Sequence, residues 1–461
     1  MNVLERRKPL DAILAEAREG GTTLERSLGV VGLTAIGIAT IIGAGIFVLT
    51  GEAAAKYAGP AIMLSFVLAG FVCACAALCY AELASTVPIA GSAYTYTYAT
   101  LGELLAWIIG WDLVLEYAVG AATVSIGWSS YVNDFFSASF GHALPLALTA
   151  APSAGGIVNL PAVAIVLAVT GLLIAGTQKA SETNTVIVAL KLLVVVFFLA
   201  VGAFHIHPQN WHPFFPFGWN GVLSGAGIIF FAYIGFDVVS TSAEEANDPQ
   251  RDLPRGIIAS LLICTVLYVL VAGVLTGMLP FAKLGVASPV SFALLQTGLN
   301  WAATVVSLGA IAGLTTVLIG LLYGQSRVFF AMSRDRLLPH FFSRLHPQLR
   351  TPWRSNLLVG LIVAAIAGFT PIETVAKLTN IGTLAAFFLV SIGVVILRHR
   401  EPHAERGFRV PFSPAIPYLA AAGSLLLIVT LPLETIVRFV VWLALGLVIY
   451  FTYGRKRSRL A

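Results

Sequence analysis

Long apolar stretches, separated by short polar segments, follow one another along almost the whole chain. Twelve such stretches of roughly 20 residues occur, at 31–55, 61–86, 101–131, 160–178, 184–204, 221–246, 256–279, 301–330, 355–371, 376–397, 414–432 and 435–453. A helix of about 20 apolar residues crosses the hydrocarbon core of a bilayer. Because backbone groups in lipid must be hydrogen-bonded within their own segment, we expect twelve transmembrane helices and an all-α membrane protein.

The composition supports this class. Of the 461 residues, 58% are hydrophobic and 11% are charged, whereas soluble proteins carry about 25% charged residues. Soluble, disordered and fibrous proteins are thereby excluded. The net charge of +5 therefore does not indicate nucleic-acid binding.

Lysine and arginine are distributed unevenly between the segments that join the stretches. Most of the 27 basic residues lie in the N-terminal segment, in alternate connections and in the tail, whereas Lys56, Lys283, Lys377 and Arg438 lie on the other side. In membrane proteins the cytoplasmic loops carry the excess of positive charge. We therefore expect a multi-pass protein of the cell (plasma) membrane with both termini in the cytoplasm.

Two of the stretches contain glycines that favour an interrupted helix. The first reads IGIATIIGAGIFVLTG and includes Gly43 and Gly45, and the sixth reads GAGIIFFAYIGFD and includes Gly235. Interrupted helices in corresponding places of two halves point to the binding site of a transporter. The alternative is that these glycines only allow neighbouring helices to pack closely.

The position of the two interrupted stretches predicts an internal repeat. Each begins a unit of five helices, and because five is odd, the two units face opposite ways across the membrane. The sequence thus predicts a 5+5 inverted repeat followed by two extra helices. The expected regions are a cytoplasmic N-terminal segment at 1–30, a first five-helix repeat at 31–204, a second, inverted repeat at 205–397, and helices 11 and 12 with the cytoplasmic tail at 398–461.

The interruptions predict a site made of peptide groups. A helix that restarts after Gly43 presents free amide groups at Ala44–Ile46, which suit a carboxylate, and the preceding half-helix ends in free carbonyls near Ile41, which suit an ammonium group. The second interruption adds the carbonyls of Phe231, Ala232 and Ile234. This charge pattern fits the zwitterion of an α-amino acid and requires no charged side chain.

Four short motifs, in order along the chain, resemble one known family. They are Gly43-Ala44-Gly45-Ile46-Phe47, Pro88-x-x-Gly91-Ser92-Ala93-Tyr94, Tyr233-x-Gly235-Phe236-Asp237, and Glu244-Glu245-x-x-Asp248-Pro249-Gln250-Arg251-Asp252-Leu253-Pro254. The chain resembles the amino acid–polyamine–organocation (APC) superfamily to about residue 455, in particular the cationic amino acid transporter branch and its bacterial relatives. The resemblance implies the LeuT-type fold, alternating access and amino acid transport. It also implies backbone contacts of the substrate with Ile41, Ala44, Gly45, Phe231, Ala232 and Ile234, and Phe231 as an aromatic lid.

Lys191 lies inside the fifth apolar stretch. Burial of a lysine in lipid disfavours its charged form, so such a residue can bind and release a proton, and intramembrane charges are usually functional or paired. In sodium-coupled relatives of this fold, a sodium ion lies between spans 1 and 8. The resemblance implies that the Lys191 ammonium takes that place, hydrogen-bonds carbonyls near Gly43 and couples transport to protons. The alternative is that the long side chain extends to water at the membrane edge.

Other polar and apolar residues within the spans are secondary candidates. Glu116 either lines the cavity and the proton path or makes a polar contact between helices. Asp237 lies three residues after Ile234 and is expected to steer the unwound backbone or pair with a hydroxyl. Thr315 is expected to face the ion position. Leu321 is expected to border the side-chain pocket, where an apolar residue favours small or neutral substrates.

The sequence therefore predicts a secondary active transporter, with proton-coupled symport of a small or neutral amino acid preferred and ion-independent exchange as the alternative. An enzyme is disfavoured because the catalytic motifs of intramembrane proteases and hydrolases are missing. A channel is disfavoured because no filter repeat or ring of charges occurs. No cofactor or metal is expected, and the four cysteines, all in apolar spans, are expected to be buried free thiols. A small accessory membrane subunit is left open as a partner.

Overall fold

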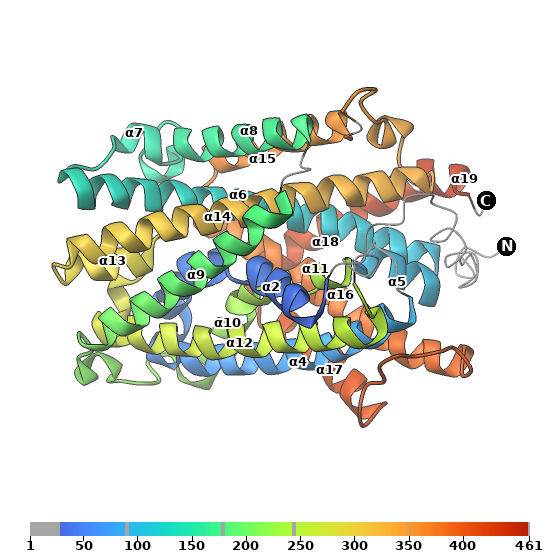
Figure 1. The fold of residues 1–461 in the computed structure, drawn as a ribbon, viewed down its shortest axis with the longest axis horizontal. Coiled ribbons are helices and arrows are strands. Elements are labelled where there is room, and N and C mark those ends of the chain that lie inside the picture. Colours follow the sequence, from blue (N-terminus) through green and yellow to red (C-terminus); the bar gives the residue numbers. More distant parts are fainter. Residues whose placement is uncertain (1–27, 88–91, 177–179, 242–245, 350, 460–461) are drawn as a thin grey trace.

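The computed structural model describes residues 28–459 except 88–91, 177–179, 242–245 and 350. Within these ranges the protein is helical, and the long helices run side by side in one general direction (Figure 1). The helices are α2 (Val30–Ile41), α3 (Thr50–Ala53), α4 (Ile62–Thr86), α5 (Ser92–Thr100), α6 (Glu103–Phe140), α7 (Leu146–Thr149), α8 (Leu160–Ala175), α9 (Ala180–Ala203), α10 (Gly218–Ile229), α11 (Val238–Thr241), α12 (Pro249–Met278), α13 (Pro289–Gln296), α14 (Asn300–Arg334), α15 (Trp353–Phe369), α16 (Ile372–Arg400), α17 (Ala415–Val429), α18 (Leu433–Ile449) and α19 (Arg455–Arg457).

Several of these helices are long and apolar enough to cross a bilayer. In the part of the chain that the structure describes, six helical stretches meet this criterion by length and composition, and the shorter apolar helices are Leu160–Ala175, Ile187–Ala203, Trp353–Phe369 and Ala415–Val429. Two boundaries differ clearly from the sequence prediction. The helix predicted at 101–131 continues to Phe140, and the helix predicted to begin at 256 begins at Pro249, where proline fits the first helical turn.

Two further helices, α5 and α13, are absent from the sequence prediction. α5 reads SAYTYTYAT and is both short and polar, whereas α13 reads PVSFALLQ and is apolar but has only 8 residues, so neither resembles a membrane span. Because the sequence prediction used only long apolar runs, it did not include these two helices.

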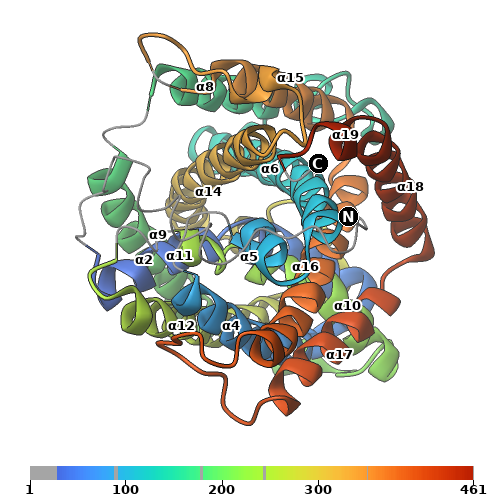
Figure 2. The ribbon, with the colours of Figure 1, turned by 90° about the vertical axis from the view of Figure 1, so that its right-hand side faces the viewer.

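The interrupted helices pack against longer ones. Figure 2 looks along the bundle and shows α4, α6, α12, α14 and α16 around its centre, with α8 and α15 packed together at one edge. α2 packs against α12, and α14 lies along α6. The segments with interruptions are therefore enclosed by continuous helices, which supply the side chains that contact them.

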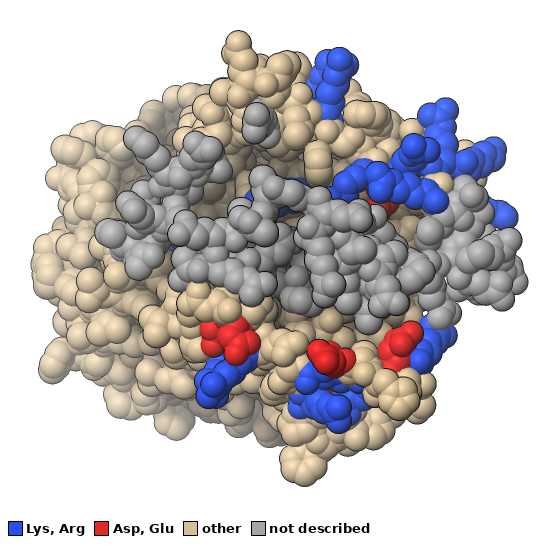
Figure 3. Space-filling model, turned by 45° about the vertical axis from the view of Figure 1, so that its right-hand side comes forward, with Lys and Arg blue, Asp and Glu red and all other residues tan. Residues whose placement is uncertain are grey.

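Charged and apolar side chains occupy different parts of the surface. Figure 3 shows the Lys and Arg side chains of one face gathered toward one end of the molecule. α14 and α16 end with basic residues, Arg334 on one and Arg398 and Arg400 on the other. In contrast, α12 exposes Leu262, Val266 and Leu270 at four-residue spacing. Such an apolar stripe is suited to contact with lipid tails.

The last long helix is attached to α6 by indole groups. The rings of Trp111 and Trp442 stack at 4.4 Å between centroids. Each indole also donates to the backbone carbonyl of the other residue, at 2.9 and 3.2 Å. Trp107 donates to the carbonyl of Gly446 at 2.9 Å. Because most of α18 is exposed, these contacts fix its position on the bundle.

A buried carboxylate extends this attachment to the end of the chain. Glu103, in the first turn of α6, has no exposed surface. It accepts hydrogen bonds from the Tyr450 hydroxyl at 2.8 Å, from the Tyr98 hydroxyl at 3.3 Å and from the Ser458 hydroxyl. Hydrogen bonds to a buried charged group contribute about 1.5–3 kcal/mol each. The segment 450–458 is therefore a stabilising part of the fold.

Replacing Tyr450 by phenylalanine tests this contact. The Tyr450→Phe variant keeps the ring but removes the donor to buried Glu103, so we expect a loss of about 1.5–3 kcal/mol and a lower thermal unfolding midpoint of the purified protein. The matched control is Tyr453→Phe, because the Tyr453 hydroxyl takes part in an exposed hydrogen bond with Arg457. Equal midpoints for the two variants would contradict the stabilising role of the Glu103 contact.

Candidate functional site

The first interruption separates α2 from a π-helical segment, Gly45–Leu49. α2 ends at Ile41, and Ile42 adopts an extended conformation with φ −73° and ψ 101°. The chain becomes helical again at residues 44–45, so the first N–H groups of the new segment lack partners within the helix. These groups form the positive end of a helix dipole inside the protein, which suits an anionic group.

The second interruption follows α10. The helix passes into a 3-10 turn, Phe230–Tyr233, and Ile234 is extended with ψ 135°. Gly235 has φ 113°, a conformation that favours glycine. The chain resumes a helical path at Val238. The helix interruptions predicted from the two glycine-containing stretches are therefore present.

The two interrupted segments cross in direct backbone contact. A Cβ atom on Gly45 would lie 2.2 Å from the Cα of Ala232, and one on Gly235 would lie 2.9 Å from the carbonyl of Thr40. The Thr40 hydroxyl donates to the carbonyl of Gly235 at 2.8 Å. Glycine at both crossings thus allows peptide groups of the two segments to approach each other.

A tyrosine from α12 joins the two segments. The hydroxyl of Tyr268 lies 2.7 Å from the carbonyl of Ile41 and 2.9 Å from the carbonyl of Ala232, and both contacts are buried. A carbonyl that an interrupted helix leaves without a partner is costly in an apolar interior. Tyr268 compensates this cost in both segments and holds them together.

Lys191 of α9 contacts the end of α2. Its Nζ donates to the carbonyl of Ala39 at 2.8 Å and to that of Ile42 at 3.3 Å. Its alkyl chain lies against α14, because a Cβ on Gly313 would be 3.1 Å from Lys191 Cε. The side chain is 0% exposed, so the alternative that it extends to water is wrong for this structure.

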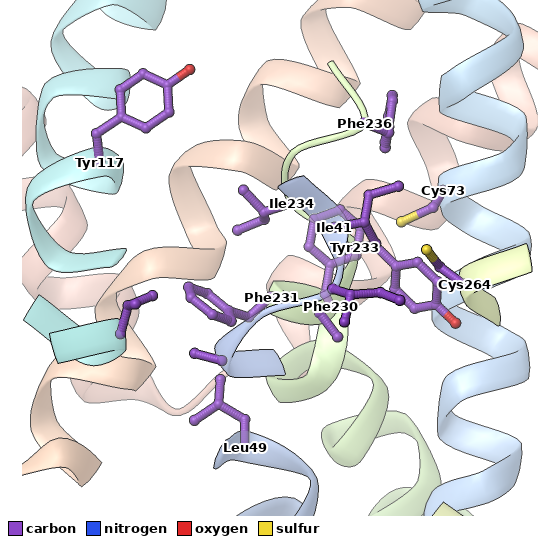
Figure 4. Close-up of a cluster of buried hydrophobic side chains, with 14 of the residues drawn as sticks. Ile41, Leu49, Cys73, Tyr117, Phe230, Phe231, Tyr233, Ile234, Phe236 and Cys264 are labelled. Atoms are coloured by element: carbon purple, nitrogen blue, oxygen red, sulfur yellow. The ribbon is translucent and has the colours of Figure 1, made fainter. Parts of the chain in front are cut away.

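A cavity of about 190 Å³ lies beside the two interruptions. Phe231 and Ile234 project from the second interruption toward α6, which carries Tyr117, whereas Phe236 lies on the side of α4 (Figure 4). Another wall of the cavity is one face of α14, which is formed by Val317, Gly320, Leu321, Gly324, Val328 and Ala331. This face spans about 21 Å at 1.5 Å per residue. The cavity therefore extends from the interruptions toward the end at which α14 terminates, where exposed Arg327 also borders it.

The opposite side of the site is closed by packed side chains. The Tyr131 hydroxyl of α6 donates to the carbonyl of Phe47 at 2.5 Å. On α13, which packs against the same π-helical segment, the Ser291 hydroxyl donates to Asp134. The cavity is thus bordered by closed contacts on one side and extends along α14 on the other.

Most of the predicted site residues border this cavity. Lining residues include Ile41, Gly43, Ala44, Gly45, Phe231, Ile234, Leu321, Glu116 and Asp237. Glu116 and Asp237 are both buried, at 4% and 8% exposure. Asp237 also accepts the Ser240 hydroxyl at its backbone carbonyl, at 2.5 Å. The described geometry is thus consistent with a place for Glu116 at the cavity, one of the two interpretations left open by the sequence.

Two predicted residues lie elsewhere. Ala232 is not among the lining residues, because it faces Gly45 and its carbonyl contacts Tyr268. The hydroxyl of Thr315 accepts from Trp128 Nε1 of α6 at 3.0 Å. It does not lie on the face of Gly313 that touches Lys191, because two residues along a helix are about 200° apart. The prediction that Thr315 faces the ion position is therefore not supported by its contacts.

Sequence reasoning missed Tyr268 and Thr40. Both are single polar residues in otherwise apolar stretches, and such residues signal a buried hydrogen bond without indicating its partner. The cysteines agree with expectation: Cys73, Cys75, Cys79 and Cys264 are all free and buried.

Comparison with known proteins gives a match over nearly the full length. The sequence model of the amino acid permease family matches residues 28–452. The branched-chain amino acid permease BcaP of Bacillus subtilis (strain 168) is 51% identical over 460 residues, which cover 99% of this chain and 98% of that protein.

Two other relatives are named for different substrates. The methylthioribose transporter of the same organism is 48% identical over 462 residues, which cover 100% of both chains. The vacuolar cationic amino acid transporter 4 of Arabidopsis thaliana is 40% identical over 408 residues, which cover 87% of this chain and 68% of that protein.

The backbone crossing makes a specific prediction for glycine variants. In Gly45→Ala the new methyl group meets the Cα of Ala232, so we expect a loss of about 1–3 kcal/mol of stability from overpacking and loss of function. The control is Gly320→Ala, because a Cβ there meets no described heavy atom within 4 Å. Thermal unfolding of the two purified variants checks this expectation. A Gly45→Ala protein as stable as Gly320→Ala would show that the crossing is looser than described.

Proposed function

Because the chain belongs to the amino acid permease family, we propose that it carries a neutral amino acid of branched-chain size together with a proton by alternating access. Members of this family are membrane transporters rather than enzymes. The observation that carries the proposal is the cavity between two interrupted helices, bordered by the restart of one helix at residues 44–45 and by the extended segment at Ile234.

The peptide groups at the interruptions assign an orientation to the substrate. The carboxylate binds the amide groups at Ala44 and Gly45, where the helix dipole is positive. The ammonium group binds the carbonyl oxygens of Phe231, in the 3-10 turn, and of the extended residue Ile234. The carbonyls of Ile41 and Ala232 already contact the Tyr268 hydroxyl. In this proposal these two residues therefore hold the interrupted segments in place and do not bind the ammonium group.

The apolar part of the cavity supports a branched-chain substrate. Phe231, Ile234, Val317 and Leu321 line the cavity, and an apolar lining favours an apolar side chain. The 51% identical relative that is named a branched-chain amino acid permease also supports a branched-chain substrate. Glu116 and Asp237, which line the same cavity, make a cationic side chain the competing possibility.

The proposal includes the membrane topology that the sequence predicts. Residues 31–204 and 205–397 form two inverted five-helix repeats of a twelve-span LeuT-type fold, and both termini lie in the cytoplasm. The support is that the two interrupted segments, which the proposal takes as the first helices of the repeats, contact each other through their backbones. The cavity that extends along α14 then leads to the cytoplasm, so the structure corresponds to an inward-facing state.

Proton coupling is assigned to Lys191. As an ammonium it donates to the carbonyls of Ala39 and Ile42 and holds the end of α2 against α9 and α14. As a neutral amine it loses its charge and one donor, which weakens this hold. Release of the proton would then loosen the half-helix that borders the cavity, which links proton movement to substrate release.

A binding panel tests the substrate class. We expect leucine, isoleucine and valine to raise the thermal unfolding midpoint of the purified protein, because a ligand at about 100 times its dissociation constant contributes about 2.7 kcal/mol. Lysine, arginine and methylthioribose are the comparison ligands. Stabilisation by methylthioribose alone would contradict the zwitterion site, and stabilisation by lysine or arginine alone would contradict the apolar pocket.

Replacing Lys191 by methionine tests the coupling. In proteoliposomes we expect Lys191→Met to abolish uptake driven by a proton gradient and to retain exchange of labelled for unlabelled substrate. The control is Lys283→Met, which removes an exposed lysine. Wild-type uptake that is insensitive to the proton gradient would favour the alternative, an ion-independent exchanger.

A further inference from the structure

Asp112 of α6 is a buried carboxyl group outside the substrate cavity. It is 1% exposed, and it does not line the cavity. Both of its side-chain oxygens lack a hydrogen-bond partner among the residues that the structure describes. A polar group in this situation calls for a specific explanation.

Asp112 faces α16 at a point of close approach. A Cβ on Gly382 would lie 3.5 Å from the Cβ of Asp112. The next residue, Thr383, is 4% exposed, and its hydroxyl lies near the carboxyl group of Glu116, with which it interacts. The absence of a side chain at Gly382 thus leaves room for the carboxyl group between the two helices.

A second carboxyl group lies one turn further along α6. Glu116 is four residues from Asp112, so both project from the same face of the helix, and its Oε2 likewise has no described partner. Glu116 lines the substrate cavity. Asp112, Glu116 and Thr383 are called the Asp112 cluster below. This cluster connects the cavity with the interface between α6 and α16.

The titratable groups that interact with Glu116 are acidic or neutral, and the cation that borders the same cavity, Arg327, lies at its exposed end. Asp237 of the interrupted segment interacts electrostatically with Glu116, as does Asp112 itself. Tyr80 of α4 and Tyr117 of α6 are the neutral titratable groups near Glu116. Among the described side chains, no lysine, arginine or histidine forms an ion pair with Asp112 or Glu116.

An unpaired carboxylate is unfavourable in such a place. Transfer of an ion from water to an apolar interior costs several kcal/mol even after relaxation, and neighbouring acidic groups add repulsion. A carboxylic acid avoids both costs, and its O–H can donate to the Thr383 hydroxyl or to Glu116. Because no described cation forms an ion pair with Asp112 or Glu116, the neutral acid is the form that this packing accommodates.

We propose that Asp112 is a second proton-binding site, separate from Lys191 and from the substrate, which is occupied while α6 and α16 pack as they do here. The binding step adds one proton to one carboxylate oxygen and removes one negative charge. By linkage, protons favour this packing over any arrangement in which Asp112 meets water. The proposal depends on the packing of the two helices and not on the substrate that the cavity carries.

The test is the pH dependence of stability without substrate. A group that is protonated in the folded protein and ionised in the unfolded chain decreases the folding equilibrium constant tenfold for each pH unit. The stabilisation that comes from the proton on Asp112 is fully present at pH values below the ordinary pKa of an aspartate, and it declines as the pH rises above that value. Between pH 6 and pH 8 the Asp112 contribution therefore amounts to a hundredfold change, measured as a fall in the thermal unfolding midpoint of the full-length wild-type protein in detergent.

Asparagine is the informative replacement. Asp112→Asn keeps the shape and a donor but releases no proton, so we expect a midpoint that falls less steeply with pH than in wild type, by the equivalent of that hundredfold change. The matched control, Asp248→Asn, alters an exposed aspartate and should keep the wild-type slope. An unchanged slope in Asp112→Asn overturns the proposal.

A second measurement covers the case in which Asp112→Asn does not fold. Infrared spectroscopy of the wild-type protein distinguishes a neutral carboxyl group by its C=O stretching band. We expect such a band near neutral pH with a hydrogen–deuterium shift, and a wild-type spectrum without it overturns the proposal. Neither measurement uses transport, so a failed substrate prediction and a failed Asp112 prediction are separable.

Discussion

The structure depends on how peptide groups freed by interrupted helices are satisfied away from water. An intact helix hydrogen-bonds its own backbone, but α2 and α10 each leave several groups without that partner. Side chains from other elements take over part of this role: Tyr268 contacts carbonyls of both segments, Thr40 contacts Gly235, and Lys191 contacts the end of α2. The groups that remain face a cavity. The proposed binding site thus lies where the compensation of backbone groups is incomplete.

This arrangement joins substrate binding to the stability of the bundle. The same carbonyls that end α2 are contacted by a lysine on α9 and a tyrosine on α12, so any movement of α2 exchanges several hydrogen bonds at once. Close contact at Gly45 restricts the movement further, because the two segments touch through their backbones. Packed interfaces of this kind favour discrete arrangements over gradual deformation. The interrupted helices are therefore suited to change between defined states.

Sequence reasoning located the apolar helices and both interruptions because hydropathy and glycine are local signals. It also found Lys191, since a charge in an apolar run is conspicuous. It could not find α5, which is short and polar, or α13, which is apolar but too short to resemble a span. It missed Tyr268 and did not foresee the contact of Thr315 with Trp128, because the direction of a side chain toward a neighbouring helix depends on tertiary packing. The contacts of Asp112 with α16 depend on two segments that are 270 residues apart and left no trace in the local pattern.

The contact of Glu103 with Tyr450 and Ser458 has a consequence for biosynthesis. The Tyr98 donor precedes Glu103 in the chain, but the donors Tyr450 and Ser458 follow it by 347 and 355 residues. Domains generally fold from the N-terminus as they emerge from the ribosome, yet this acid can be buried with all three partners only after residue 458 has been made. A chain that stops before Tyr450 would keep a solvated acidic group where the described protein has a sealed contact, and quality-control proteases could distinguish the two.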